Sequence, residues 1–230
     1  MADTQGSAPS RADLHIHSRY SPDSRLDPRE IGRLAKARGL TALALTDHNS
    51  VDGHGPMRAA CLEEGVLFIP GIEVTSAEGH ILAYGVGKAP TSGKSAAETI
   101  EEVHALGGIA SAAHPERVYT GLSVQVVRAA RFDAVEAFNA QSAEGHNAQA
   151  RKVAEELRLP VTGGSDAHFG DRISQGYLRM EAPPERADEA IEIILRGRNA
   201  AGGTRSGFGQ VLRRSVATSY RWVLRGGRGI

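Results

Sequence analysis

Short apolar stretches alternate with longer amphipathic segments along most of this chain. The apolar stretches lie at residues 40–45, 66–70, 80–84, 108–113, 134–138 and 160–164. The segments between them that carry helical signals lie at residues 28–37, 56–65, 95–106, 122–130 and 143–157. Buried strands that alternate with helices are typical of a parallel α/β arrangement. The pattern predicts an α/β fold of about seven strands, the last of which, near residues 176–180, has the weakest signal.

Residues 12–17 form an apolar stretch in which chemistry-bearing side chains stand at every second position. Asp13, His15 and His17 are separated by leucine and isoleucine. Side chains of a strand alternate between its faces, so we expect these three to point the same way. Imidazole nitrogens and a carboxylate that converge on one point suit a metal ion. The pair of histidines predicts a metal site only if later strands supply further ligands.

Residues that can bind a metal ion also lie at one end of almost all the remaining predicted strands. They are Asp47, His48, Glu73, His80, His114, Asp166 and His168. In α/β barrels the active site is built at the carboxyl ends of the strands, whereas open sheets concentrate their ligands at one switch point. Contributions from at least five strands therefore favour closure into a barrel.

Composition and charge limit the remaining choices. The length of 230 residues fits one large domain, and 27 basic residues balance 27 acidic ones. All the acidic residues lie before Ile193, so the body is net negative, whereas the last part carries eight arginines. The single cysteine, Cys61, excludes an internal disulfide framework and suits a reducing cytoplasm. We expect a soluble cytoplasmic protein with no transmembrane segment, a disordered leader over residues 1–11 and a barrel domain over residues 12–202.

Residues 203–230 predict a basic amphipathic C-terminal helix. On a helical wheel, the apolar residues Phe208, Val211, Leu212, Val216, Tyr220, Val223 and Leu224 share a broad face opposite Arg213, Arg214, Arg221 and Arg225. The commonest explanation is a helix packed on the barrel by its apolar face. Its cationic side would attract phosphate-rich partners, which keeps a nucleic-acid function open, and Trp222 is an aromatic residue on which a base could stack. Attachment to anionic lipid is a third, weaker alternative.

Nine residues are candidate metal ligands, which is more than a single ion can use. They are His15, His17, Asp23, His48, Glu73, His80, His114, Asp166 and His168. Two or three ions are implied, and a carboxylate such as Glu73 or Asp166 can bridge a pair about 3.5–4 Å apart. We expect Asp13 and Asp47 to orient ligands, Asp13 by a hydrogen bond to a ligand ring. His104 is expected to be structural, while His54 and His146 fit either the substrate mouth or the surface.

Five segments in order carry a resemblance to a known family: residues 15–17, 46–48, 71–73, 114–115 and 165–168. They resemble the motifs of the polymerase and histidinol phosphatase (PHP) family of metal-dependent phosphoesterases, over roughly residues 12–200. The resemblance implies a distorted seven-stranded, TIM-like (β/α)7 barrel with a two- or three-metal centre. It places one ion on His15, His17, Glu73 and Asp166, a second on Glu73, His80 and His114, and a third on Asp23, His48 and His168. Some relatives have histidine at the position of Asp23.

The predicted reaction follows from these ligands. Mixed nitrogen and oxygen ligands suit Mn, Zn or Fe, and such ions supply hydroxide from bound water near neutral pH. We expect a bridging hydroxide to attack a phosphate ester in line, at ions held by His15, His17, Glu73, Asp166 and His168. Arg117 and Arg172 are candidates for binding the phosphate through two hydrogen bonds each. That both are ordinary exposed surface arginines is an equal alternative.

Other functions fit less well. Amidohydrolases also begin with two alternate histidines, but they add a lysine at a later strand end, and no lysine stands there. A serine hydrolase would have a G-x-S-x-G segment, which Gly164-Ser165-Asp166 does not give. We therefore expect hydrolysis of phosphate monoesters or diesters of small molecules, such as nucleotides or sugar and amino-alcohol phosphates. The alternative is an exonuclease or RNA-binding protein that uses the arginine-rich tail. The oligomeric state stays open.

Overall fold

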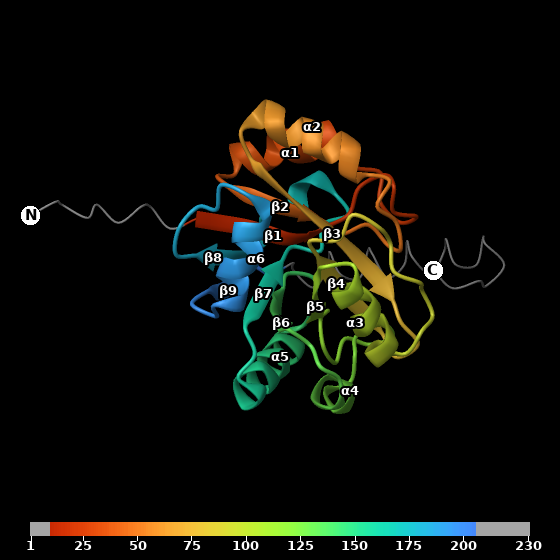
Figure 1. Cartoon of the computed structure of the whole chain (residues 1–230). Coiled ribbons are helices and arrows are strands. Elements are labelled where there is room, and N and C mark those ends of the chain that lie inside the picture. Colours follow the sequence, from red (N-terminus) through yellow and green to blue (C-terminus); the bar gives the residue numbers. More distant parts are fainter. Residues whose placement is uncertain (1–9, 206–230) are drawn as a thin grey trace, which may run out of the picture.

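A nine-stranded sheet that curves into a nearly closed barrel forms the centre of the computed structural model, which describes residues 10–205 (Figure 1). The strand order is β7-β6-β5-β4-β3-β2-β1-β8-β9. The strands are β1 (Ser10–Ile16), β2 (Ala42–Leu45), β3 (Leu67–Thr75), β4 (His80–Tyr84), β5 (Ile109–Ala112), β6 (Ala134–Asn139), β7 (Val161–Gly164), β8 (Gly176–Met180) and β9 (Ala200–Gly203). Ser10 and Arg11, which were expected in the disordered leader, belong instead to β1, and Gly203, expected in the tail, ends β9. The rest of the predicted leader and residues 206–230 of the predicted tail lie outside the described residues.

The first five helices that connect the strands begin and end close to the predicted limits, whereas the sixth was not predicted. They are α1 (Pro28–Ala37), α2 (His54–Glu64), α3 (Ala96–Ala105), α4 (Val124–Ala129), α5 (Glu144–Leu157) and α6 (Ala187–Leu195), with a short 3₁₀ turn, η1 (Gly170–Arg172). The side chain of Asp27 caps α1, with proline in its first turn, and Ser95 and Glu98 form a capping box on α3. None of the helices within residues 10–205 is both long and apolar enough to cross a bilayer.

Strands β1 to β7 make up the barrel, which confirms the predicted distorted (β/α)7 architecture. Strands β1, β2 and β3 are parallel, as are β5, β6 and β7. Strand β4 lies between the two groups and is antiparallel to both neighbours, because it returns from β3 through a tight turn rather than through a helix. The reversal places the beginning of β4, at His80, beside the carboxyl ends of the parallel strands.

The barrel closes where β1 meets the segment after β7. Ile16 and Ala167 form a parallel bridge, in which the His17 amide donates to the Ala167 carbonyl at 3.0 Å. Space there is minimal, since a Cβ atom on Gly164 would lie 2.3 Å from His15 Cβ. At the other end of this seam, β8 pairs antiparallel with β1, and β9 pairs with β8. The closure brings the first histidines next to the ligands that follow the last barrel strand.

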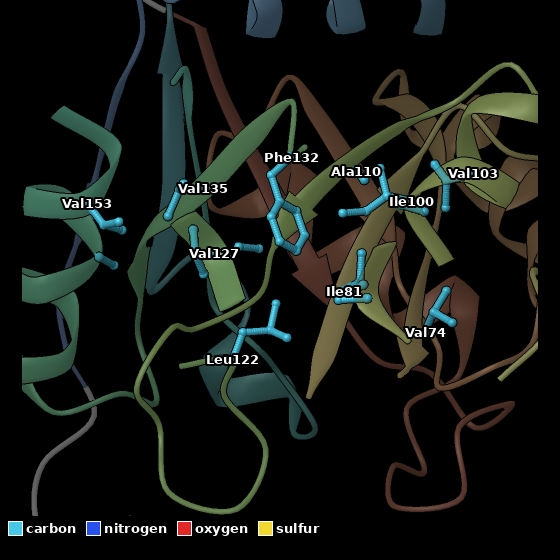
Figure 2. Close-up of a cluster of buried hydrophobic side chains, with 14 of the residues drawn as sticks. Val74, Ile81, Ile100, Val103, Ala110, Leu122, Val127, Phe132, Val135 and Val153 are labelled. Carbon is cyan, nitrogen blue, oxygen red and sulfur yellow. The ribbon is translucent and has the colours of Figure 1, made fainter. Parts of the chain in front are cut away.

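Apolar side chains fill both the inside and the outside of the sheet. Alternate residues of most strands, including Leu14, Ile69 and Tyr84, form one buried cluster that must lie inside the barrel because it draws on strands all around it. Ile193 and Ile194 of α6 belong to this inner cluster, so α6 covers the end of the barrel opposite the predicted ligands. Outside, α3, α4 and α5 cover β3 to β6 through a second cluster (Figure 2). Cys61 is buried in a third.

Candidate metal centre

All nine predicted ligands gather at the carboxyl end of the barrel. Eight of them are buried, and Asp23 is half-buried. Eight of them lie in a strand or just after its end, whereas Asp23 lies in the loop between β1 and α1. His80 stands at the start of its strand rather than the end, but the reversed direction of β4 brings it to the same place.

Glu73 lies at the centre of this cluster. Its Oε2 atom is 3.2 Å from His15 Nε2, 3.1 Å from His17 Nε2 and 3.3 Å from His48 Nδ1. Its Oε1 atom lies 2.7 Å from His80 Nδ1 and 2.9 Å from His114 Nε2. The two carboxylate oxygens therefore face two different sets of imidazoles, which is the arrangement that a bridging carboxylate requires.

The spacing of the donor atoms fits a divalent ion. His15 Nε2 and His17 Nε2 are 3.2 Å apart, and Asp166 Oδ1 is 3.8 Å and 3.5 Å from them. Ligands that bind a tetrahedral ion at about 2.1 Å lie about 3.4 Å from one another. His15, His17 and Glu73 offer one such close group, and His15, His114 and Asp166 offer another.

A further group surrounds Asp23. Its Oδ2 atom is 2.6 Å from His168 Nε2 and 3.6 Å from His48 Nε2, and His17 completes the set. His48 stands between this group and Glu73, since its Nε2 faces Asp23 and its Nδ1 lies 3.3 Å from Glu73 Oε2. Donor atoms of His48, Glu73 and His80 also form a close set. The assignment of individual residues to individual ions remains a prediction.

The charges of the cluster are strongly coupled. Burial opposes ionisation of Glu73, but the surrounding imidazoles hold its pKa well below the usual range. Burial also disfavours a charged His17, yet the carboxylates of Asp166 and Glu73 raise its pKa to about 9. His114 has the opposite balance, because burial and the nearby Arg117 lower its pKa to about 4. A metal ion must displace protons from the imidazoles that hold them, so binding is coupled to pH.

The two predicted orienting aspartates accept hydrogen bonds from backbone amides and a serine hydroxyl rather than from ligand rings. Asp13 Oδ1 accepts hydrogen bonds from the amides of Ser165 and His15, and Oδ2 accepts one from Ser174. The expectation of a hydrogen bond to a ligand ring is therefore corrected: β1 is irregular between Asp13 and Ile16, and the Asp13 side chain ties together the seam of the barrel. Asp47 accepts hydrogen bonds from the amide and hydroxyl of Ser18, which fixes the chain just after His17.

Glu136 is a residue of the site that sequence reasoning missed. It lies on β6 with a fully buried side chain, and its Oε1 atom accepts a hydrogen bond from His15 Nδ1 at 2.9 Å. Its Oε2 atom accepts from the His114 amide and from Asn139 Nδ2. The available signal was a lone carboxylate inside the otherwise apolar stretch 134–138, because a buried charge in a strand needs partners.

The two predicted phosphate-binding arginines have different surroundings. The Arg117 guanidinium contacts Asp166 Oδ2 directly, and its side chain is 20% exposed, so it reaches the cluster while facing solvent. Arg172 lies on η1 with its Nε 3.3 Å from the neighbouring Asp171 carboxylate. The structure therefore brings Arg117 to the ligands, and the side chain of Arg172 is largely buried.

The remaining histidines do not join the cluster. His104 on α3 pairs with Asp133 at 2.7 Å. His54 Nε2 donates to the Gly71 carbonyl, and His146 Nδ1 is buried without a hydrogen-bond partner in residues 10–205. Three of the most exposed large apolar residues follow ligands closely in the chain, namely Val118 and Tyr119 after His114 and Phe169 after His168.

Comparison with known proteins gives an independent line of information. A family model described as the PHP domain matches residues 13–199. The uncharacterized protein MJ1587 of Methanocaldococcus jannaschii is 35% identical over 159 residues, which make up 64% of this chain and 93% of that protein. A 3',5'-nucleoside bisphosphate phosphatase of Chromobacterium violaceum is 37% identical over 94 residues, 39% of this chain and 33% of the phosphatase. A 5'-3' exoribonuclease of Haemophilus influenzae is 39% identical over 64 residues, 28% of this chain and 23% of the exoribonuclease.

Solved structures share the fold. A two-domain protein from Bacteroides vulgatus, described as containing a predicted PHP-like metal-dependent phosphoesterase, superposes with a TM-score of 0.73 at 20% identity. The superposition covers 94% of this chain and 72% of that one.

Proposed function

The chain belongs to the PHP domain family and is a hydrolase of phosphoric esters, and from this premise we propose that it hydrolyses small phosphate esters at a centre of two or three divalent ions. The observation that carries the proposal is the position of Glu73, whose two oxygens lie 2.7–3.3 Å from five imidazole nitrogens. Neutral imidazoles and carboxylates together suit Mn, Zn or Fe.

The depth at which each ligand is buried indicates its role in the site. Divalent ions bound there would lower the pKa of water and neutralise phosphoryl oxygens. His15, His17, Glu73, His114 and Asp166 are the deepest ligands, since their side chains are at most 2% exposed. Asp23 is the most exposed ligand at 17%, so the ester enters from its side of the cluster.

Arg117 is the residue best placed to orient the phosphate. Its guanidinium contacts one oxygen of Asp166, and the planar fork has further N–H groups for a phosphoryl oxygen. Burial opposes the charged form, but Asp166 raises the pKa of Arg117, so it stays a cation. A fixed cation beside the ligands would hold the ester in line for attack.

The proposed substrate is a nucleotide or another phosphate monoester with an apolar or planar organic part. Tyr119 is fully exposed and Phe169 is 52% exposed, and both follow a candidate ligand by a few residues. Such side chains beside a phosphate site offer contact area for the part of the substrate that carries the phosphate. The activity named for the Chromobacterium violaceum relative supports this class, over the third of that protein which the similarity covers.

A second candidate function is cleavage of RNA from an end. It is favoured by the eight arginines without an acidic residue from Ile193 onward and by the likeness to the exoribonuclease. Cationic tails bind nucleic acid in a strongly salt-dependent way. Activity on oligonucleotides that falls steeply with salt, while activity on mononucleotides does not, would favour this alternative.

The test is a phosphate-release assay on the full chain loaded with Mn, Zn or Fe. Its substrates are nucleoside monophosphates, nucleoside bisphosphates, sugar phosphates and short oligonucleotides. We expect turnover of nucleoside phosphates to exceed that of glycerol phosphate, and Tyr119→Ala to raise KM for nucleotides only. Leu62→Ala is the control, because Leu62 is exposed on α2, away from the mouth. Turnover of glycerol phosphate that equals that of nucleoside phosphates, together with an unchanged nucleotide KM in Tyr119→Ala, would reject the nucleotide proposal.

A further inference from the structure

We propose that Glu136 is a positioning residue that sets the orientation and tautomer of His15 and holds the backbone of His114. It would thereby link the imidazoles that face the two oxygens of Glu73. This inference rests on the proposed metal centre, because a positioning residue has a measurable role only if the imidazoles bind ions.

Glu136 makes its contacts deep inside the barrel. Its side chain is 0% exposed, and it projects from β6, two strands away from β4. Oε1 accepts from His15 Nδ1 at 2.9 Å, while Oε2 accepts from the His114 amide at 2.8 Å and from Asn139 Nδ2 at 3.1 Å. A carboxylate that accepts three hydrogen bonds has fixed orientation, so it can fix the groups that donate to it.

The contact with His15 decides which ring nitrogen can bind an ion. An ionised carboxylate only accepts, so His15 Nδ1 must carry a proton in this hydrogen bond. A neutral imidazole then has its lone pair at Nε2. That atom is the one that lies 3.2 Å from His17 Nε2 and 3.2 Å from Glu73 Oε2, so Glu136 directs the lone pair into the cluster.

The contact with His114 acts on the backbone. His114 has φ of +27°, in a region that a residue with a side chain adopts only when its surroundings hold it there. The hydrogen bond from its amide to Glu136 supplies such a restraint, and His114 Nε2 then lies 2.9 Å from Glu73 Oε1. One carboxylate thus positions His15, on the Oε2 side of Glu73, and His114, on the Oε1 side.

The nearly isosteric substitution Glu136→Gln separates this role from simple packing. An amide has one oxygen in place of two, so it cannot accept from both His15 and the His114 amide. If the amide NH₂ faces His15, the ring must accept at Nδ1 and carry its proton at Nε2, which removes the lone pair from the cluster. If the NH₂ group faces His114 instead, it meets the backbone N–H of His114, and two donors cannot hydrogen-bond to each other. Either arrangement weakens ion binding without creating a cavity.

The matched control lies three residues earlier in the chain. Asp133 also joins a histidine to a backbone amide, since its Oδ2 accepts from His104 Nε2 and from the Ala110 amide, both at 2.7 Å. His104 lies outside the cluster, on α3. Asp133→Asn therefore removes the same kind of contact with no route to the ligands.

The experiment is calorimetric titration of the stripped full chain with Zn²⁺, with circular dichroism to confirm folding. We expect Glu136→Gln to bind about 10- to 100-fold more weakly than wild type, and Asp133→Asn to bind as wild type does. Folded Glu136→Gln that binds with wild-type affinity would overturn this inference alone. A wild-type chain that binds no ion would overturn the metal centre and this inference together.

A measurement on the unaltered chain covers the case in which Glu136→Gln does not fold. Long-range ¹H–¹⁵N correlation spectra of the wild-type protein loaded with Zn²⁺ report the state of each ring nitrogen of His15. We expect the proton at Nδ1 and the metal at Nε2. A proton at Nε2, or metal at Nδ1, would overturn the assignment.

Discussion

Replacing Gly164 by alanine is expected to open the barrel at the seam that brings the ligands together. Gly164 is the last residue of β7, and a Cβ atom added there would lie 2.3 Å from His15 Cβ and 2.6 Å from the His15 nitrogen. Both contacts involve atoms that cannot rotate away. The φ of Gly164 is outside the left-handed region, so the cost is one of space alone. Strand β7 must move about 1 Å from β1 to make room.

The size of the effect follows from this displacement. Insertion of an extra methyl group into a packed core costs about 1–3 kcal/mol, and metal sites tolerate displacements of only about 0.5 Å. We therefore expect Gly164→Ala to lose about 2 kcal/mol of unfolding free energy in urea and at least about tenfold in Zn²⁺ affinity. The control is Gly145→Ala in α5, where an added Cβ meets no atom within 4 Å. That variant should be as stable as wild type or slightly more stable.

One result would refute the reasoning. If Gly164→Ala unfolds within about 0.5 kcal/mol of wild type and binds Zn²⁺ equally well, the contact between β7 and β1 does not hold the ligands in place.

Three further predictions concern the cluster itself. Asp166→Asn should lower phosphate release at least about 100-fold while the chain stays folded; unchanged turnover would remove Asp166 from the ligands. Ion removal by a chelator should lower Tm, and an ion at 100 times its Kd should restore about 2.7 kcal/mol of stability; a Tm that does not respond would argue against a folded-state metal site. Burial favours neutral His17, but neighbouring carboxylates raise its pKa to about 9, so below that pH an ion must displace its proton. Affinity should fall as pH falls, by up to about tenfold per unit for each proton displaced, and calorimetry in buffers of different ionisation enthalpy counts those protons; none released at pH 7 would contradict the assignment.

Much of the architecture could be predicted from local signals. Each strand that ends in a histidine or carboxylate is short, apolar and followed by polar residues, as at His48 and Asp166, so strand ends and candidate ligands could be recognised together. Closure into a barrel followed from the number of strands that contribute ligands. The grouping of His80 with the others depends on the reversed direction of β4, which the short connection from β3 allows but does not specify.

The parts that were missed depend on contacts between distant segments. Alternation predicted a shared direction for Asp13 and His15, but the irregular register of β1 turns Asp13 toward the amides of Ser165 and Ser174. Glu136 was read as part of an apolar strand because its partner, His15, lies 121 residues earlier. Helix α6 and strand β9 were not predicted, although α6 closes the barrel with residues that match an amphipathic pattern.

Phosphate release before and after removal of metal tests the central claim most directly. The full chain, stripped with a chelator and then reloaded with Mn, Zn or Fe to two or more equivalents, is assayed on nucleoside phosphates. We predict that stripping abolishes hydrolysis and that reloading restores it. Hydrolysis that survives stripping, or a fully loaded chain that releases no phosphate from any of the esters, would contradict the account.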